Sequence, residues 1–413
     1  MLHHMEVVGV AYVIGLNSGS SLDSVDVVLL DMDMDAEGWP KLHSVKAYHE
    51  YPWPTSVHRS VMRAINLDMG INDFCRLNFV VGATFATYVN DLLQTEGLES
   101  QDIAVIGVDG QTIYQEPPES TRWLGREFDD VVAAFEDGRL GSTLQIGEGA
   151  VIAALTKIST VTHFRPADMA LGGTGAPIEE FLDYVHYRDK APLITLNIGG
   201  IANIHAIHPQ ISRIMAFDTG PGNILMDRLA QEYFGLPYDR DGAIARSGHV
   251  NTSLLKTLLS HPFLKRTPPR SAWREDFSDA YLQSVIQEFP RVSKEDLMAT
   301  FAEFTVQAIV LALQQVPFMN DTSYLVGNGG GVLNTMLTER LQELLPAHMH
   351  FVLSDLFGIP AKANEAAKFG ALGYAHMMNI PGNIPHASGA LGSAILGKLH
   401  RPPRAVWTER GQE

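Results

Sequence analysis

The stretch AYVIGLNSGSSLDSVDVVLLD, residues 11–31, sets the organisation of the chain. Ala11–Leu16 is an apolar run that predicts a buried strand, and Val25–Leu30 predicts its antiparallel return. A polar turn from Asn17 to Ser21 lies between them. A hairpin tip made of Ser and Gly exposes amides and hydroxyls that can surround a phosphate group. An ordinary hairpin turn is the alternative, because Ser and Gly are common in turns.

The first half of the chain continues with alternating helices and strands. Residues 104–108 predict a buried strand that ends at Asp109-Gly110-Gln111-Thr112. Residues 116–142 are rich in Pro, Glu and Asp with little periodicity, which is typical of a surface insertion. Apolar spacing near 3.6 residues predicts helices at Ser56–Asn66, Asp73–Gln94 and Glu148–Thr156. The expected strands are Ala104–Val108 and Ser159–His163.

The second half repeats this order of elements. The predicted strands are Leu193–Asn197, Ile201–Ile207, Arg213–Phe217, Tyr324–Val326 and His350–Leu353, and the predicted helices are Ile224–Phe234, Leu254–Leu259, Asp279–Glu288, Lys294–Gln315, Val332–Leu344 and Ala361–Met378. Strands that alternate with helices favour an α/β fold. We therefore predict two α/β lobes with a cleft between them. Residues 1–165 form the first lobe, residues 166–377 form the second, and residues 378–413 return to the first.

The composition excludes several classes of protein. The chain has 413 residues, of which 46% are hydrophobic, so it can form a sizeable core. A net charge of −17 disfavours a nucleic-acid partner, which needs a basic face. The longest apolar run, residues 7–16, is too short to span a membrane, and no secretion signal is evident. Cys75 is the only cysteine, which excludes an internal disulfide and fits a reducing cytoplasm.

Two further glycine-rich turns follow predicted strands. In Phe217-Asp218-Thr219-Gly220-Pro221-Gly222-Asn223 a carboxylate precedes glycines that lead into a helix amino terminus. Such a terminus attracts anions, and an acid beside it can serve as a general base next to a phosphoryl donor. The alternative is that Asp218 only caps the helix. Gly327-Asn328-Gly329-Gly330-Gly331 offers a surface on which an adenine or ribose can pack, or else a tight turn between strand and helix.

Two other segments carry charged residues beside small ones. Residues 164–177 form a glycine-rich loop with Arg165 and Asp168 that leads into a helix. Glu365 lies in the first turn of a predicted helix, where a carboxylate most often compensates the helix dipole and less often binds a metal. Neither a Walker loop nor a GxGxxG motif after a strand is present.

The order of these motifs resembles the anhydro-N-acetylmuramic acid kinases. The resemblance runs collinearly from about residue 13 to residue 395 through GLNSGSSLDSVD, DGQTI, FRPADMALGGTGAP, NIGGIAN, FDTGPGN, NGGG, GIPAKANEA and PGNIPHASGA. It implies a two-lobed hexokinase–actin-like (ribonuclease H-like) fold. Parts of the chain also resemble the fungal levoglucosan kinases. Members of the family often pair, so a homodimer is among the expectations.

The resemblance implies an ATP- and Mg²⁺-dependent reaction in which water opens a 1,6-anhydro sugar while its O6 accepts the γ-phosphate. It implies that Asp218 is the general base and that Glu365 is associated with the metal. The residues expected to face the sugar are Asp109, Gln111, Thr112, Arg165 and Asp168. Together with the glycine turns, the residues expected to bind nucleotide are Gly19, Ser20, Ser21, Leu22, Asp23, Ser24, Val25, Asp26, Gly199, Gly200, Asn203, Gly220, Gly222, Asn223, Gly329, Gly330 and Gly331.

The chain departs from the family pattern at a few of these places. The family usually has His where this chain has Asp109, and Gly where it has Ser24 and Trp273. Asp109 disfavours a sugar that carries a carboxylate, which keeps levoglucosan as an alternative to anhydro-N-acetylmuramic acid. The same departures leave open a sugar- or nucleotide-binding protein without catalysis. An ordinary kinase of open hexoses, which lacks the hydrolytic step, is the third alternative.

Overall fold

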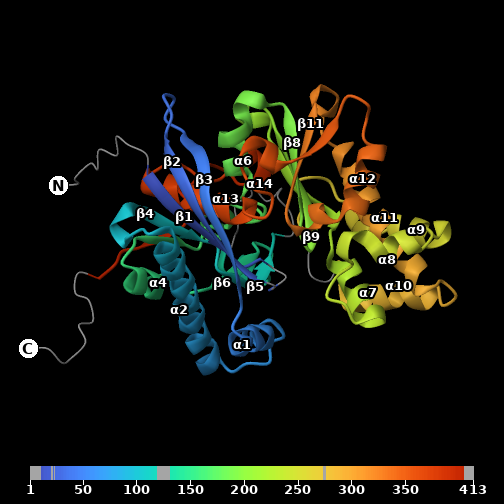
Figure 1. Ribbon diagram of the computed structural model, residues 1–413, viewed down its shortest axis with the longest axis horizontal. Coiled ribbons are helices and arrows are strands. Elements are labelled where there is room, and N and C mark those ends of the chain that lie inside the picture. Colours follow the sequence, from blue (N-terminus) through green and yellow to red (C-terminus); the bar gives the residue numbers. More distant parts are fainter. Residues whose placement is uncertain (1–10, 20–21, 23, 119–130, 273–275, 404–413) are drawn as a thin grey trace, which may run out of the picture.

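Two large mixed β-sheets, one in each half of the chain, form the centre of the molecule. The computed structural model describes residues 11–19, 22, 24–118, 131–272 and 276–403. Figure 1 shows the two sheets side by side, each with its own helices. The predicted α/β architecture with two lobes is therefore confirmed.

The first sheet contains the hairpin with which the chain begins. Its order is β13-β7-β4-β1-β2-β3, in which β1, β2 and β3 are antiparallel while β4 and β7 run parallel to β1. Asn17 at the end of β1 faces Asp26 on β2 across the hairpin. The strands are β1 (Ala11–Asn17), β2 (Ser24–Met34), β3 (Pro40–Pro52), β4 (Ile103–Val108), β7 (Thr160–Thr162) and β13 (Lys398–His400).

The second sheet repeats the topology of the first. Its order is β10-β9-β8-β11-β12, with β8, β9 and β10 antiparallel and with β11 and β12 parallel to β8. Asn197 near the end of β8 therefore occupies the place that Asn17 has in the first sheet. This repeat agrees with the predicted hexokinase–actin-like fold. The strands are β8 (Leu193–Ile198), β9 (Ile201–Ile207), β10 (Met215–Pro221), β11 (Tyr324–Asn328) and β12 (His350–Leu353).

Helices cover both faces of the first sheet. Successive side chains of β1 enter different cores, because Ile14 packs toward α2 and Val13 packs toward α13. Gly15 and Gly107 let α13 lie directly on the strands, since a Cβ there would come within 1.9 Å of Ala366 O and 2.0 Å of Phe369 O. The helices are α1 (Thr55–Ile65), α2 (Ile71–Glu96), α3 (Val131–Glu136), α4 (Gly149–Thr156) and α13 (Asn364–Met377).

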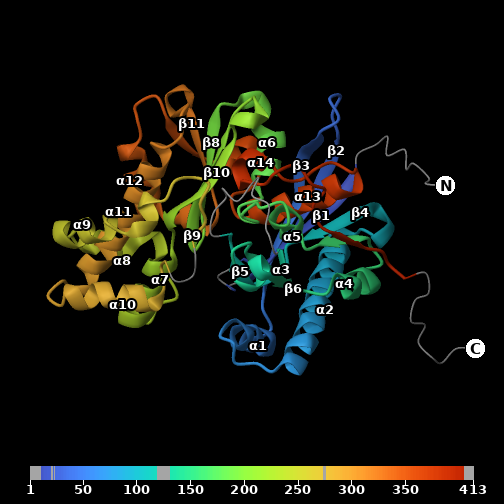
Figure 2. The same ribbon diagram turned by 180° about the vertical axis from the view of Figure 1, so that it is seen from behind.

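The helices of the second lobe lie on the side of its sheet that faces away from the first lobe (Figure 2). The central one, α11, is long and apolar enough to cross a membrane by length and composition, but 78% of its apolar window is buried inside this lobe, as in a core helix. The helices are α7 (Ile224–Phe234), α8 (Ala243–Ser247), α9 (Thr252–Leu259), α10 (Asp279–Glu288), α11 (Lys294–Leu313) and α12 (Thr335–Leu344).

Three short helices and the C-terminal segment connect the lobes. α6 packs on α13 and also on β9, so it touches both halves. β13 pairs with β7 of the first sheet, and the division of the chain into lobes at residues 165 and 377 stays a prediction. The remaining elements are α5 (Arg165–Met169), α6 (Glu180–Tyr187), α14 (Pro385–Ser388), β5 (Gln111–Glu116) and β6 (Ser142–Ile146).

The structure differs from the sequence-based prediction in a few elements. Strand β3 was not predicted, because it is an edge strand whose half-exposed polar residues hide the alternation. The helix expected from Val332 begins only at Thr335, since the Asn334 side chain accepts hydrogen bonds from the amides of Met336 and Leu337 and caps it there. β5 and β6 flank the predicted insertion of residues 116–142 and pair with each other, and residues 119–130 lie outside the described part.

Candidate active site

The β1–β2 hairpin tip is braced by the turn that follows β4. Ser18 Oγ lies 2.9 Å from Gln111 Oε1 and 3.1 Å from Gly110 O. Gly19 has a positive φ of 61°, which a glycine adopts without strain. Ser18 and Gly19, where the tip begins, are therefore held against this turn. Leu22 and Val25 point into the core, and Ser20, Ser21 and Asp23 lie outside the described residues.

Asp26 is a half-buried carboxylate beside this hairpin. Its Oδ1 accepts a hydrogen bond of 2.8 Å from the Tyr48 hydroxyl. Burial, together with the nearby carboxylates of Glu365 and Glu50, raises the pKa of Asp26 to about 7 against the opposing effect of the Tyr48 hydrogen bond. Asp26 is therefore a second acidic group near Glu365.

Glu365 joins the two lobes. One carboxylate oxygen accepts from Asn17 Nδ2 at 2.8 Å and the other accepts from Asn197 Nδ2 at 2.5 Å. These two asparagines come from equivalent places in the two sheets, so Glu365 bridges the ends of β1 and β8. Burial raises the pKa of Glu365, and the carboxylate of Glu179 raises it further. The close packing of α13 on β1 and β4 brings Glu365 to this place.

Asp218 lies inside β10 at a bulge, where the pairing with β9 shifts between Asp218 and Gly220. A bulge re-aims the side chain next to it. Oδ2 accepts a hydrogen bond of 2.6 Å from the amide of Ala272, and Oδ1 accepts none from any described residue. Burial raises the pKa of Asp218 to about 7. The Ala272 amide and Arg270 lower this pKa, while Glu179 raises it.

The glycines predicted around Asp218 form one compact turn. The amides of Gly222 and Asn223 donate to the carbonyls of Gly200 and Gly199 at 2.9 and 2.8 Å. A Cβ on Gly222 would lie 2.2 Å from Gly199 O, so only glycine fits there. Gly220 follows the bulge with a φ of 154°, and Asn203 faces Asp218 across the ladder.

The third glycine turn packs on β8. A Cβ on Gly329 would lie 2.1 Å from Asn197 Oδ1, and one on Gly331 would lie 2.3 Å from Ile198 Cγ2. Gly330, in contrast, has open space in front of it. The structure thus brings this turn next to Asn197 and Glu365, and packing of an adenine or ribose on it stays a prediction.

Asp109 and Arg165 form a buried ion pair. Arg165 Nε and Nη2 donate to the two carboxylate oxygens at 3.1 and 2.7 Å. Burial alone would lower the pKa of Arg165, but Asp109 raises it, so the guanidinium stays charged. Gln111 is fully buried and its Nε2 reaches Gly19 O at 3.4 Å, while Thr112 Oγ1 accepts from Gln145.

Asp168, expected to face the sugar, is instead fully enclosed. Oδ1 accepts from Asn383 Nδ2 at 2.8 Å and from Ser388 Oγ at 2.7 Å, and Oδ2 accepts from the Gly175 amide at 3.0 Å. Its position follows from the tight fold of the loop, because a Cβ on Gly173 would lie 2.0 Å from Oδ2. Asp168 thus ties the glycine-rich loop to the C-terminal segment.

We expect Asp168→Ala to lower the free energy of unfolding by about 2–4 kcal/mol, because it leaves three buried donors unpaired. Chemical denaturation at neutral pH measures this loss. Asp137→Ala serves as the matched control, since Asp137 is exposed and pairs only with Arg139 among the described residues. Equal stabilities of the two variants would contradict the structural role of Asp168.

Glu179 was missed by the sequence analysis although it lies at the centre of the site. It precedes α6, is half-buried, and raises the pKa values of Asp109, Asp218 and Glu365 together. The available signal was the acidic pair Glu179-Glu180 directly after the glycine-rich loop. The structure therefore brings together Asp218, Glu365, Asp109 and Arg165 from both halves of the chain.

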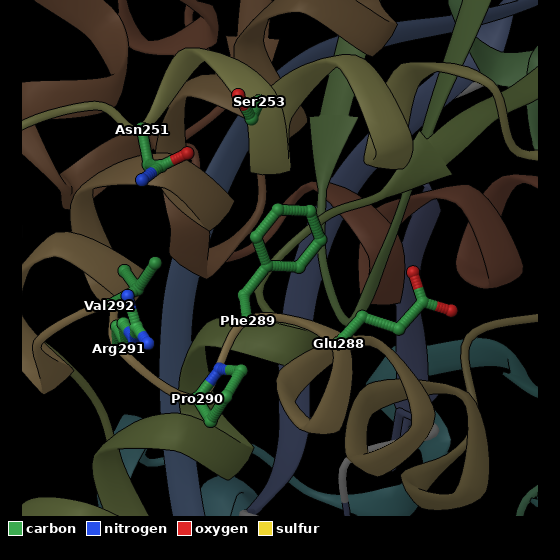
Figure 3. Close-up of a pocket in the computed structure, with 7 residues that line it drawn as sticks. All are labelled: Asn251, Ser253, Glu288, Phe289, Pro290, Arg291 and Val292. Carbon is green, nitrogen blue, oxygen red and sulfur yellow. The ribbon is translucent and has the colours of Figure 1, made fainter.

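Two pockets lie away from these residues. One of about 360 Å³ is on the second lobe and is lined by Asn251, Ser253, Glu288, Phe289, Pro290, Arg291 and Val292 (Figure 3). The other, of about 370 Å³, lies between Trp39, Phe181, Ile211 and the segment 381–393. Neither holds Asp218 or Glu365, so the cleft beside these two residues stays a prediction.

The family model and the curated relatives agree on one family. The family model for anhydro-N-acetylmuramic acid kinase matches residues 11–402. The anhydro-N-acetylmuramic acid kinase of Bacillus thuringiensis subsp. konkukian (strain 97-27) is 34% identical over 401 residues, which cover 95% of this chain and all of that protein. A protein of the same name from a strain of Bacillus cereus is 34% identical over 400 residues, which cover 95% of this chain and 98% of that protein.

Among solved structures, the activator of the 2-hydroxyisocaproyl-CoA dehydratase from Clostridium difficile is similar at 10% identity, with a TM-score of 0.42 over 89% of this chain and 96% of that one. The family match covers nearly the whole described chain. This chain belongs to the anhydro-N-acetylmuramic acid kinase family.

Proposed function

We propose that this protein is an ATP-dependent kinase of 1,6-anhydro sugars that converts anhydro-N-acetylmuramic acid to N-acetylmuramic acid 6-phosphate. The observation that carries the proposal is the Asp218 carboxylate. One of its oxygens is fixed by the Ala272 amide, and the other has no partner among the described residues. It stands beside glycine turns suited to phosphate, in a chain of this family.

In the proposed reaction, water attacks the anomeric carbon and gives its proton to Asp218 Oδ1. The bond from that carbon to the bridging oxygen, O6, breaks at the same time. The freed O6 takes the γ-phosphoryl group of ATP, so that ADP leaves. A positioned base typically contributes about 10²–10⁴-fold to the rate of such a step.

The β1–β2 hairpin and Gly200 are proposed to hold the phosphates through their amides. Gly199 and Gly222 are proposed to shape this turn, because their own amides already donate to the carbonyls of Ile201 and Gly200. Gly329–Gly331 is proposed to support the adenosine. Arg165, fixed by Asp109, is proposed to line the sugar side, and the fully buried Gln111 is proposed to act there only through the turn that it holds. Asp168 acts on this side only through the loop it holds.

The donor set near Glu365 fits Mg²⁺. Glu365 and Asp26 offer carboxylate oxygens, which Mg²⁺ prefers, and the described residues contain no group of three or more His, Cys, Asp or Glu side chains that would form a complete cage. Mg²⁺ is commonly held by one or two carboxylates together with waters and substrate phosphates. When bound, it would neutralise phosphate charge.

A neutral anhydro sugar such as levoglucosan is the second candidate substrate. The Asp109–Arg165 ion pair favours it, because a guanidinium already paired with Asp109 is less available to the lactyl carboxylate. Levoglucosan needs only hydroxyl partners. Its product would be glucose 6-phosphate.

A coupled assay of ADP release with each sugar tests the proposal. We expect turnover of anhydro-N-acetylmuramic acid, with ¹⁸O from labelled water incorporated at the anomeric carbon of the product. A higher kcat/KM for levoglucosan would support the second candidate. Nucleotide binding without turnover of either sugar would support a binding protein, and phosphorylation without ¹⁸O incorporation would support an ordinary sugar kinase.

The cytoplasm is the proposed location, which the single cysteine supports. A homodimer stays a prediction.

A further inference from the structure

Asp218 lies on an edge strand whose outer side is covered by a short segment rather than by another strand. β10 is the last strand of its sheet. The Asp218 amide donates to Arg270 O at 3.0 Å, and the Asp218 carbonyl accepts from Arg270 Nε at 2.9 Å. An unpaired edge would leave these backbone groups to water. Arg270 therefore fixes the backbone of Asp218 on the side that the sheet leaves open.

The side chain of Arg270 is itself held firmly. It is only 5% exposed, and its guanidinium lies over the rings of Phe217 and Phe263 at 5.3 and 5.1 Å. Nη1 donates to the carbonyl of Arg266 and lies 3.4 Å from that of Leu264. A guanidinium with this many fixed acceptors has little freedom to move, so its hydrogen bond to the Asp218 carbonyl holds that backbone in place.

The same segment also fixes the carboxylate. Two residues after Arg270, the amide of Ala272 donates to Asp218 Oδ2 at 2.6 Å. Between them, Ser271 Oγ donates to the carbonyl of Ala176 in the glycine-rich loop. Residues 270–272 thus link the backbone of Asp218, its carboxylate and the loop that leads to Glu179.

The positive charge of Arg270 also supports Asp218 as a base. Burial lowers the pKa of Arg270 to about 10, and Asp218 raises it, so the guanidinium remains a cation at neutral pH. A buried cation favours the ionised form of a neighbouring carboxylate. Arg270 accordingly lowers the pKa of Asp218 against the effect of burial.

We propose that Arg270 is the positioning residue of Asp218: it fixes the bulged backbone on which the carboxylate stands and places a positive charge beside that residue. The inference rests on the proposed role of Asp218. It assigns no contact between Arg270 and substrate, because the guanidinium faces backbone carbonyls and two aromatic rings.

The test compares a neutral and a charged replacement. In Arg270→Ala we expect kcat near pH 7 to fall about 100-fold, and the acidic limb of the kcat profile to move up by about one pH unit, because the cation that lowers the pKa of Asp218 is gone. In Arg270→Lys the charge remains, so the limb stays near its wild-type position while kcat falls about tenfold through poorer geometry. Guanidinium ion at low concentration should restore part of the activity of Arg270→Ala.

Arg340→Ala is the matched control, since Arg340 in the same lobe pairs with the buried Glu303 and makes no hydrogen bond or ion pair with Asp218 in the described part of the chain. It should lower stability without moving the limb. Where Arg270→Ala does not fold, Arg270→Gln replaces it as the neutral variant. The proposal is overturned if a folded neutral variant keeps the acidic limb of the wild-type kcat profile and loses no more kcat than Arg270→Lys does.

Asp218→Asn separates this inference from the proposed function. If Asp218→Asn keeps full activity, the assignment of the base fails. If Asp218→Asn is inactive while the neutral Arg270 variants keep the wild-type pH profile, only the role of Arg270 fails. A double variant should lose little beyond Asp218→Asn, since both changes remove the same base.

Discussion

Replacing Asp218 by Asn is expected to lower kcat by about 10²–10⁴-fold with little change in the KM for ATP. The amide cannot take a proton from water. Its oxygen can still accept from the Ala272 amide, so the local fold should survive. Steady-state kinetics with anhydro-N-acetylmuramic acid, beside melting curves of both proteins, measures the loss.

The pH dependence of the wild type should report the same group. Burial raises the pKa of Asp218 to about 7, and a base works only when it is ionised. Activity should therefore rise with pH through about 7 and fall away below it. The residual activity of Asp218→Asn should lack this limb.

Asp279→Asn is the control for this change, because Asp279 lies exposed on α10 of the same lobe and pairs with Arg228. It should keep wild-type kinetics. An Asp218→Asn protein that retains more than about a tenth of wild-type kcat would show that another group accepts the proton.

Replacing Glu365 by Gln is expected to lower kcat/KM for ATP on the order of 100-fold and to raise the Mg²⁺ concentration needed for half-maximal rate. The change removes the charge that suits a cation. The NH₂ group of the new Gln side chain also faces one of two amide donors, Asn17 Nδ2 or Asn197 Nδ2. Since two donors cannot bond to each other, one of the two hydrogen bonds that Glu365 accepts is lost. Titration of the rate with Mg²⁺ at fixed ATP measures the first effect.

Glu343→Gln provides the comparison, since Glu343 is exposed on α12 and pairs with Arg340. Asn197→Ala separates the two roles of Glu365, because it breaks the hydrogen bond to the second sheet and keeps the carboxylate. A Glu365→Gln protein with unchanged Mg²⁺ dependence and a loss equal to that of Asn197→Ala would assign Glu365 to joining the lobes alone.

Much of the fold could be predicted because its signals are local. The apolar runs of residues 11–16 and 25–30 flank a polar turn, and they form the central hairpin with Asn17 opposite Asp26. The glycines at strand ends also mark real turns, since Gly222, Gly329 and Gly331 admit no Cβ. Strand β3 escaped prediction because an edge strand loses the alternation that burial on one face imposes.

The composition and order of motifs in this sequence determined two α/β lobes and pointed to Asp218, Glu365 and Arg165, since periodicity and turn chemistry act between neighbours in the chain. Only the tertiary structure decided what each of these groups touches. Glu365 meets two asparagines 348 and 168 residues away, Asp218 depends on the segment 270–272, and Asp168 is enclosed by the C-terminal segment. The burial of a side chain and its hydrogen-bond partners set its charge and what it can contact. Burial and partners are fixed only when distant segments of the chain pack together.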